Sequence, residues 1–230
     1  MSHLRVYDTE APDGLAGGTP HCHTACTEAC AVIAGRGRVL TLAGDGFRST
    51  PIEAGSFVWF TPGTIHRLVN ESGDLEILVI MANAGLPEAG DMVLTLRAAC
   101  STTTTPTDRR RCSASSATTE ADDRAARARR DLAVEGLDEL LHAGPDGLER
   151  FHRRAAELVR PSVEGWRARW EARPPRRRRA DGRTLAALAR GDIAHLGESS
   201  VHALPPPPDA RRYGCCGTLG VVQPAEPDLG

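Results

Sequence analysis

Residues 21–35 read HCHTACTEACAVIAG, and residues 55–70 read GSFVWFTPGTIHRLVN. Both stretches combine short apolar runs with Gly and Pro, a composition typical of strands separated by turns. In a strand, residues two positions apart point to the same face. We therefore expect His21 and His23 on one face and Cys22 on the other. Glu28 has the opposite parity, so it joins the two histidines only if a turn or bulge lies between residues 23 and 28.

The pattern of short strands continues through the first 96 residues. Apolar runs occur in ACAVIAGRGRVLTL (29–42), SFVWFTPG (56–63) and LEILVIM (75–81), with Gly, Pro, Asp and Asn between them. This spacing, without a helical period, predicts an all-β sandwich or barrel. The segment Gly35-Arg36-Gly37 suits a tight hairpin between two strands.

A third histidine completes a set of candidate metal ligands. His66 lies 38 residues after Glu28 and follows the turn sequence TPGT (61–64). Three imidazoles and one carboxylate form an N₃O donor set suited to a divalent ion. An octahedral ion held by four protein ligands keeps about two positions for water, dioxygen or substrate.

The two quoted stretches resemble the two motifs of the cupin superfamily. HCHTACTEACAVIAG (21–35) is similar to the first motif, and GSFVWFTPGTIHRLVN (55–70) is similar to the second. The resemblance covers about residues 15–95. It implies a mainly β protein with a single cupin-type double-stranded β-helix, or jelly-roll, barrel. It also implies that the metal ligands are His21, His23, Glu28 and His66.

The chain departs from the cupin motifs at two loop positions. Leu15 stands six residues before His21, where the first motif has a glycine, and Thr61 stands where the second motif has its first proline. Neither position is a ligand, so the departures concern loop geometry. Because the cupin fold supports many reactions, the resemblance specifies the fold more strongly than the function.

Residue usage excludes several classes of enzyme. All 28 basic residues are arginines, so the chain has no lysine for a Schiff base or for a phosphate-binding P-loop. The seven cysteines are odd in number, and there is no apolar N-terminal signal segment. Reduced thiols and a cytoplasmic location are therefore expected, with no membrane association.

Charge and periodicity divide the chain into four parts. Residues 1–96, the predicted barrel, carry a net charge of −6, whereas residues 97–230 carry +4. Residues 97–119 lack apolar periodicity and are predicted to be a disordered linker. Residues 120–204 have helical periodicity and predict an α-helical extension, and residues 205–230 begin with a proline run and are predicted to be a Pro-rich tail.

Other conspicuous residues have structural interpretations. Asn70 is expected to help a strand turn, and Cys30 to fill apolar space. Cys22, Cys26 and Cys30 repeat every four residues, but strand geometry does not bring them to one zinc site. The aromatic and aliphatic residues of the second motif are interpreted chiefly as core: Phe57, Trp59, Phe60, Ile65 and Leu68. The later histidines are interpreted as ordinary surface or interface residues: His142, His152, His195 and His202.

Two functional hypotheses follow from these features. The first is a metal-dependent cupin enzyme of the dioxygenase, isomerase or cyclase type that acts on a small organic molecule. Its metal would be Fe, Mn, Ni or Zn, and no catalytic residue beyond the ligands is identifiable. The second is a non-catalytic cupin that senses a ligand or metal and has a regulatory or interaction role. A storage-like barrel is a weaker third hypothesis, because such a barrel needs no ligand set. The apolar stripes of the helical half predict a homodimer, and nucleic-acid binding is disfavoured because no DNA-binding motif is recognisable.

Overall fold

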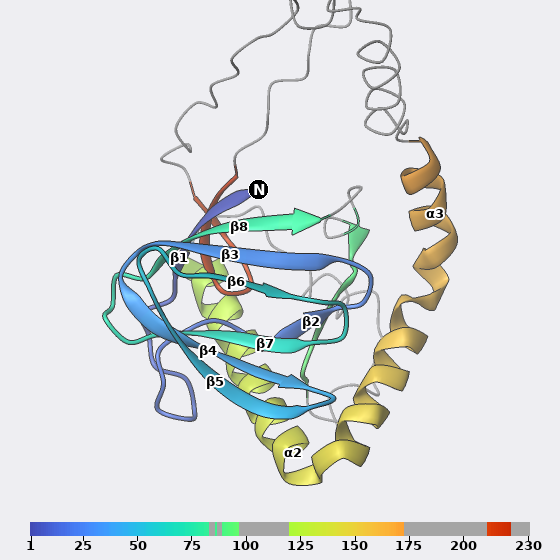
Figure 1. Ribbon diagram of the computed structural model, residues 1–230, viewed down its shortest axis with the longest axis horizontal. Coiled ribbons are helices and arrows are strands. Elements are labelled where there is room, and N and C mark those ends of the chain that lie inside the picture. Colours follow the sequence, from blue (N-terminus) through green and yellow to red (C-terminus); the bar gives the residue numbers. More distant parts are fainter. Residues whose placement is uncertain (83–85, 87–88, 97–119, 173–210, 222–230) are drawn as a thin grey trace, which may run out of the picture.

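The computed structural model describes residues 1–82, 86, 89–96, 120–172 and 211–221 (Figure 1). Two antiparallel sheets form a jelly-roll barrel. The six-stranded sheet has the order β10-β11-β1-β8-β3-β6, and the five-stranded sheet has the order β5-β4-β7-β2-β9. The strands are β1 (Ser2–Val6), β2 (His21–His23), β3 (Thr27–Ala34), β4 (Arg36–Ala43), β5 (Gly46–Glu53), β6 (Phe57–Phe60), β7 (Ile65–Asn70), β8 (Glu76–Ala82), β9 (Met92–Leu94), β10 (Arg212–Tyr213) and β11 (Gly217–Val221).

The chain changes sheet twice between β2 and β4. β2 belongs to the five-stranded sheet, β3 to the six-stranded sheet, and β4 to the five-stranded sheet again. The predicted hairpin at Gly35-Arg36-Gly37 is therefore wrong, since β3 and β4 do not pair. Instead β4 pairs with β5, and the tight turn follows Ala43, which is registered with Gly46. Gly35 marks a crossing between the sheets, which local turn chemistry does not distinguish from a hairpin.

The barrel interior holds one apolar cluster to which both sheets contribute. Its buried members are Leu4, Val6, Cys30, Val32, Val39, Ile52, Phe60, Leu68, Leu75, Ile77, Val79 and Cys216. Phe60, Ile65 and Leu68 are buried, as predicted. The prediction that Phe57 and Trp59 are core residues is wrong, because their side chains are 53% and 65% exposed. They alternate with Val58 and Phe60 along β6, the edge strand of its sheet, and so face outward.

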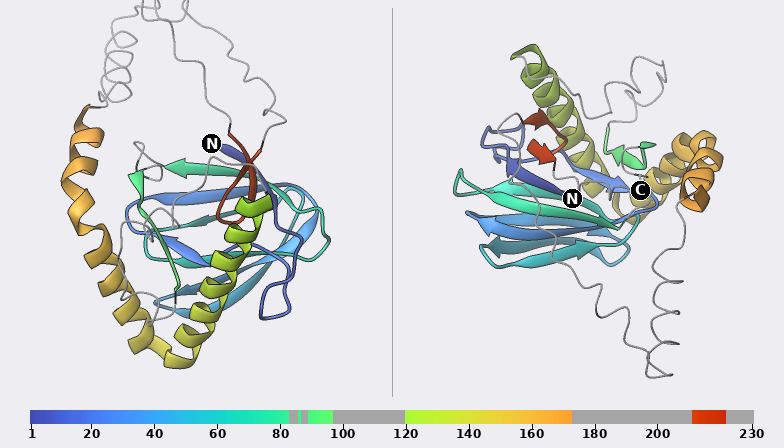
Figure 2. Two further views of the ribbon diagram at one scale, coloured as in Figure 1. Left: turned by 180° about the vertical axis from the view of Figure 1, so that it is seen from behind. Right: turned by 90° about the horizontal axis from the view of Figure 1, so that it is seen from above.

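Within the predicted helical extension at residues 120–204, the described residues 120–172 are helical. Helix α2 (Glu120–Val159) bends at Gly144, where φ is 62°, and Pro145 follows the bend. A short 3₁₀ turn, η3 (Arg160–Ser162), leads into α3 (Val163–Ala172). Figure 2 shows the first half of α2 crossing the barrel wall and the second half continuing along its side into α3. At the bend, Gly144 adopts its φ of 62° without the strain that a side chain would cause.

Helix α2 packs on the outer face of the five-stranded sheet. The second apolar cluster joins residues of this sheet to residues of α2: Cys22, Leu42, Ile65, Val93, Leu137, Leu148 and Ala155. All six residues of β7 are buried, because one face lines the barrel and the other lies beneath covering segments. The apolar stripe of the helix is thus satisfied within its own chain.

The C-terminal segment adds strands to the barrel. The sequence analysis assigned residues 205–230 to a Pro-rich tail, but Arg212–Tyr213 and Gly217–Val221 form a hairpin whose second strand pairs with β1. The barrel is therefore not confined to residues 1–96. The prolines at the start of the segment indicated an extended tail. The two strands are short, and they form because β11 pairs with β1 and β10 pairs with β11. The predicted linker at 97–119 and the end of the predicted helical extension lie outside the described residues.

Of the helices in the described part of the chain, none has a hydrophobic stretch suited to crossing a lipid bilayer.

Candidate metal centre

Strand register brings two of the predicted ligands face to face. β2 pairs with β7, and His21 is registered with His66. Their ring centroids are 4.3 Å apart. His23 lies two residues after His21 on β2, so it points to the same side, as the parity argument predicts. All three side chains are buried, with 2–7% exposed.

Glu28 reaches the histidines from the opposite sheet. It lies on β3, where it is registered with Phe60 and Met81, and the chain crosses between the sheets at residues 24–26. This crossing is the intervening turn that the parity of Glu28 requires. Glu28 Oε2 lies 3.0 Å from His23 Nε2, 3.4 Å from His66 Nε2 and 3.9 Å from His21 Nε2. The structure therefore brings all four predicted ligands together.

Each imidazole is oriented by a hydrogen bond on its other nitrogen. His21 Nδ1 donates to the Thr19 carbonyl at 2.9 Å, and His66 Nδ1 donates to the Thr64 carbonyl at 3.1 Å. His23 Nδ1 donates to the carboxylate of Asp91 at 2.7 Å. With Nδ1 occupied, the Nε2 atoms are directed toward Glu28. Metal-binding histidines are held in this way, by a carbonyl or a carboxylate behind the ring.

Asp91 is a member of the site that the sequence does not indicate. It is fully buried, and its second carboxylate oxygen accepts a hydrogen bond from the Cys26 amide at 3.0 Å. Asp91 therefore ties His23 to the crossing that positions Glu28. No signal in the sequence marks it, because it lies 68 residues from His23 and outside both motifs.

The protonation states of the cluster differ among its members. Burial would raise the pKa of Glu28, but His66, His23 and His21 hold it well below its usual value, so the carboxylate is ionised. Burial and the proximity of His21 lower the pKa of His66, which keeps this ring neutral. Burial opposes charge on His23, but Asp91 and Glu28 raise its pKa to about 9. His23 must therefore release a proton before Nε2 can bind a cation.

One atom of the cluster lacks a hydrogen bond. Among the described side chains, His66 Nε2 is a buried polar atom without a hydrogen-bond partner. An unsatisfied buried nitrogen costs about 1–3 kcal/mol, so the fold retains it at an energetic cost. A neutral imidazole with a free lone pair, beside two further imidazoles and a carboxylate, fits a divalent ion with borderline N and O ligands.

Apolar residues form the walls around these ligands. Phe60 stacks on His66 with ring centroids 4.3 Å apart and an interplanar angle of 10°. Cys30 lies in the barrel cluster, which agrees with its predicted role as a filler, and its Sγ is 3.8 Å from Glu28 Oε1. Burial and Glu28 raise the pKa of Cys30 well above its usual value, so the thiol stays protonated. Cys22 packs on the opposite side of β2, so it shares no site with Cys30.

Other residues from the sequence analysis have structural roles. Asn70 donates to the Val6 carbonyl and accepts from the amides of Gly73 and Leu75, which confirms that it supports a turn. His152 Nε2 contacts the Gly63 carbonyl at 2.8 Å and links α2 to the barrel. His142 is an exposed helix residue, and His195 and His202 lie outside the described residues.

Two cysteines that sequence analysis left without a role lie beside His21. Cys215 Sγ is 3.6 Å from His21 Nδ1, and Cys216 Sγ is 4.0 Å from the same atom. Burial lowers the pKa of His21, but Cys215 and Glu28 raise it overall. The hydrogen bond with Cys216 and the charge of His21 lower the pKa of Cys215, although burial opposes this. These thiols are 194 and 195 residues from His21, so no local pattern indicates the contact.

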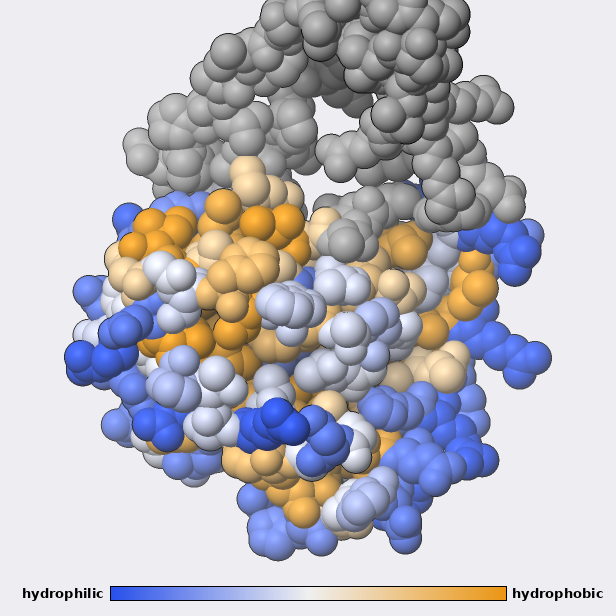
Figure 3. Space-filling model, viewed as in Figure 1, coloured by the Kyte–Doolittle hydropathy of each residue, from blue (hydrophilic) through white to orange (hydrophobic). Residues whose placement is uncertain are grey.

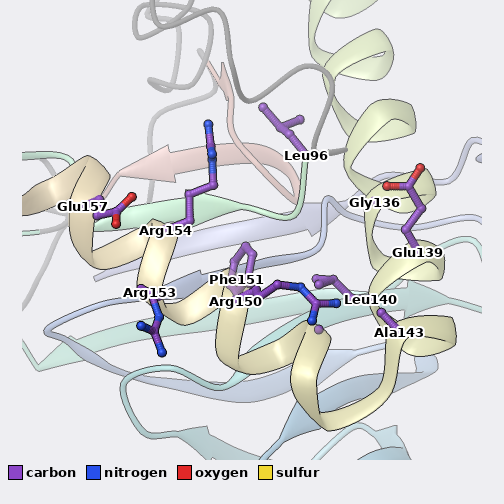
Figure 4. A pocket seen from close by; sticks show the side chains of 11 residues that line it. Leu96, Gly136, Glu139, Leu140, Ala143, Arg150, Phe151, Arg153, Arg154 and Glu157 are labelled. Atoms are coloured by element: carbon purple, nitrogen blue, oxygen red, sulfur yellow. The ribbon is translucent and has the colours of Figure 1, made fainter.

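A groove of about 420 Å³ lies elsewhere, inside the bend of α2 (Figure 4). Leu140 and Phe151 supply its apolar lining, and Arg150 and Arg154 lie along it. The groove includes none of the four predicted metal ligands. The candidate centre is therefore the buried cluster within the barrel and not this surface feature.

Comparison with known proteins agrees with this geometry. A family profile for the cupin domain matches residues 9–81, a span that contains all four predicted ligands but neither Asp91 nor the C-terminal hairpin. A comparison with curated protein sequences found no match.

Several solved structures resemble parts of the chain. A proposed sugar phosphate isomerase from Acidithiobacillus ferrooxidans is 30% identical over 27% of this chain and 38% of its own, with a TM-score of 0.24. KdgF from Halomonas sp. is 21% identical over 29% and 56% of the two chains, with a TM-score of 0.25. The WlaRB TDP-quinovose 3,4-ketoisomerase from Campylobacter jejuni is 12% identical over 35% and 61%, with a TM-score of 0.30. The chain spans less than two thirds of each of these proteins.

The family match and the observed barrel agree with the two sequence motifs. Both motifs lie on facing strands of the jelly roll, and their predicted ligand positions meet inside it. Residues 9–81 of this chain match the cupin-domain profile, and they supply most of the strands of the jelly roll.

Proposed function

We propose that this chain is a metal-dependent enzyme that acts on a small organic molecule within the cupin barrel. The observation that carries the proposal is the convergence of three Nε2 atoms on Glu28 Oε2 while each Nδ1 is held from behind. A purely structural cluster of ion pairs needs no such uniform orientation. The proposed ligands are His21, His23, Glu28 and His66.

The proposed cofactor is one divalent ion of Fe, Mn, Ni or Zn. An ion bound by these four residues would polarise a substrate oxygen or activate dioxygen. The residues of the chain prepare the site for it. Asp91 fixes the ring of His23 and accepts the hydrogen bond that sets its tautomer. Cys30 contacts one carboxylate oxygen of Glu28, so the other oxygen stays directed at the imidazoles.

The side chains around the candidate centre suit a small apolar or partly polar substrate. Phe60 covers one face of His66, and Met81 is partly buried against the barrel cluster. Apolar walls exclude water and strengthen electrostatic interactions at the centre. Dioxygenase, isomerase and cyclase reactions are the proposed classes, and a non-catalytic sensor of metal or ligand is the alternative.

Metal content of purified variants tests the site. Elemental analysis should show that Glu28→Gln and His66→Ala each lose most of the ion bound by the wild type, because each removes a ligand. Cys22→Ala is the matched control, since Cys22 lies next to His21 and His23 but packs on the opposite face of β2. Full metal content in both ligand variants would exclude the assignment. Circular dichroism checks that the barrel remains folded.

Turnover separates the two functional hypotheses. The metal-loaded protein is screened for oxygen consumption and for isomerisation or cyclisation of small oxygenated substrates. Activity that disappears in Glu28→Gln supports the enzyme. Stable metal binding without turnover for any of the ions supports the sensor.

We also propose that two copies of the chain pair through the outer face of the six-stranded sheet. Four apolar side chains are at least 39% exposed there: Ile33, Phe57, Trp59 and Ile80. In the strand register, Ala31 lies beside Phe57 and Ala29 beside Trp59. Phe57 and Trp59 thus form a bulky ridge, and Ala29 and Ala31 form a shallow strip next to it. Figure 3 shows hydrophobic side chains gathered over this part of the barrel. A two-fold axis would place the ridge of each copy on the strip of the other, which buries apolar area that a monomer exposes.

A further inference from the structure

The turn of the C-terminal hairpin carries two adjacent thiols to the edge of the candidate metal centre. Cys215 and Cys216 lie between β10 and β11, and β11 is anchored to β1 by antiparallel pairing. The two residues are outside the span that matches the cupin profile. The turn therefore places two thiols beside the centre that neither of the two motifs contains.

The turn is fixed to the barrel by backbone hydrogen bonds. The Tyr7 amide donates to the Cys216 carbonyl at 3.1 Å, and the Tyr7 hydroxyl donates to the Gly214 carbonyl at 3.0 Å. The amide and hydroxyl of Thr19 both donate to the Cys215 carbonyl, at 3.2 and 2.5 Å. These bonds hold the position of both thiols relative to the segment that leads into β2.

Close approach of the turn requires a glycine on the barrel. A Cβ atom at Gly18 would lie 2.6 Å from Cys216 Cβ and 2.9 Å from its Sγ. Carbon atoms of separate side chains do not approach to this distance, so any larger residue at position 18 would displace the turn. The missing side chain at Gly18 creates the space that Cys216 occupies.

Four donor atoms meet at this point. Cys215 Sγ and Cys216 Sγ each lie 3.8 Å from the Thr19 carbonyl oxygen, and they lie 3.6 and 4.0 Å from His21 Nδ1. The two sulfur atoms and the imidazole nitrogen are all within 4.8 Å of one another. Cys216 is buried, whereas Cys215 is partly exposed.

We propose that Cys215 and Cys216 form a second metal site, with His21 Nδ1 as the third ligand, for a thiophilic divalent ion such as Zn²⁺ or Cd²⁺. Thiolate sulfur selects softer ions than the N₃O set inside the barrel. On binding, each thiol releases one proton and forms one metal–sulfur bond, and no electron is transferred. The S₂N donor set leaves a fourth position of a tetrahedral ion for water or for the Thr19 carbonyl oxygen.

The shared histidine couples this site to the barrel centre, a consequence that rests on the proposed function. A neutral imidazole has one lone pair and one N–H group. His21 therefore ligates through Nε2 or through Nδ1, and not through both. An ion on the cysteines with His21 as a ligand withdraws His21 from the barrel centre, and thermodynamic linkage makes the effect reciprocal.

Titration of the full-length protein with Cd²⁺ tests the thiol site. We expect the ultraviolet cadmium–thiolate charge-transfer band to saturate at one equivalent and to be lost in Cys215→Ser/Cys216→Ser. Cys22→Ala is the control, because it removes a buried thiol that packs in the cluster on the opposite face of β2, and it should keep the band. A band of wild-type intensity in the double variant, or equal loss in the control, would overturn the proposal.

A measurement on the wild type avoids dependence on variant folding. Cadmium NMR of the wild-type protein should give one resonance in the range of mixed sulfur and nitrogen ligation. A resonance confined to the range of nitrogen and oxygen ligation would contradict the site.

Glu28→Gln distinguishes failure of this inference from failure of the proposed function. The variant should lose Mn²⁺ binding at the barrel centre but keep the cadmium–thiolate band. Loss of the band in Glu28→Gln would show that the cysteines do not form a site of their own. In the wild type, saturating Mn²⁺ should weaken Cd²⁺ binding, and unchanged affinity would exclude His21 as the shared ligand.

Discussion

His23 Nδ1 and the buried carboxylate of Asp91 form a 2.7 Å hydrogen bond that joins residues 68 positions apart. The same carboxylate holds the backbone amide of Cys26, where the chain leaves β2 for β3. Asp91 thus fixes both the ring of one proposed ligand and the crossing that delivers another. It gives the centre a rigidity that the four ligands alone do not provide.

Asp91→Asn should weaken metal binding by about tenfold to a hundredfold, because outer partners of metal-binding histidines contribute on this scale. The substitution keeps the shape of the side chain but removes the charge that orients and polarises His23. Binding of Mn²⁺ is measured by electron paramagnetic resonance. Asp45→Asn is the control, since Asp45 is exposed beside the β4–β5 turn and pairs with Arg48. Equal affinity in Asp91→Asn and wild type would contradict the role assigned to Asp91.

Stability of the metal-free protein should fall as the pH rises toward 9. Asp91 and Glu28 raise the pKa of His23 from 6.5 to about 9. The folded state therefore keeps this proton up to a higher pH than the unfolded state does. The stabilisation is complete below pH 6.5 and is lost as the pH passes through the raised pKa. It amounts to roughly 3 kcal/mol. Urea unfolding of chelator-treated protein measures it.

Asp91→Asn provides the comparison for that pH dependence. The variant should be less stable than the wild type at pH 6.5, where His23 is charged, and the two should converge above pH 9. A stability difference that stays constant over this range would show that the His23–Asp91 ion pair does not cause the effect.

Leu137→Ala should destabilise the protein by about 2–5 kcal/mol, the usual cost of emptying a buried leucine site. Leu137 is 6% exposed and packs between α2 and the five-stranded sheet. Leu141→Ala, one turn further along the same helix, is the control because Leu141 is 37% exposed. Urea unfolding measures both variants. Equal, small effects would show that α2 contributes little to the stability of the barrel.

Trp59→Glu should convert a dimer into a monomer while leaving metal content unchanged. The charge would lie in the proposed apolar interface, where Trp59 is 65% exposed in the single chain. Light scattering measures the mass of each protein. Phe47→Glu is the matched control, since Phe47 is 48% exposed on β5 in the other sheet. A wild type that is already monomeric, or a Trp59→Glu protein that remains dimeric, would exclude this interface.

Short-range information determined a large part of the barrel and its centre. Alternation along a strand placed His21 and His23 on one face, and parity required a turn before Glu28. The motif spacing indicated which four residues meet. These features could be predicted because strand geometry has a period of two and because turn residues such as Gly and Pro act locally. The helical period of residues 120–204 likewise indicated helix α2, in which Val134 and Leu137 are buried but Leu132 and Leu141 are exposed.

Tertiary structure decided what depends on pairing across long sequence separations. A glycine after β3 is compatible with a hairpin and equally with a crossing to the other sheet. Only the pairing of β4 with β5 shows that the chain changes sheets at Gly35. Phe57 and Trp59 have the composition of core residues, yet β6 is an edge strand and turns them outward. Asp91 and the thiols of Cys215 and Cys216 reach the histidines through β9 and the β10–β11 hairpin, short strands that are stable only on a sheet that is already formed. The sequence therefore indicated the four candidate ligands, whereas the three-dimensional fold determined which residues surround them.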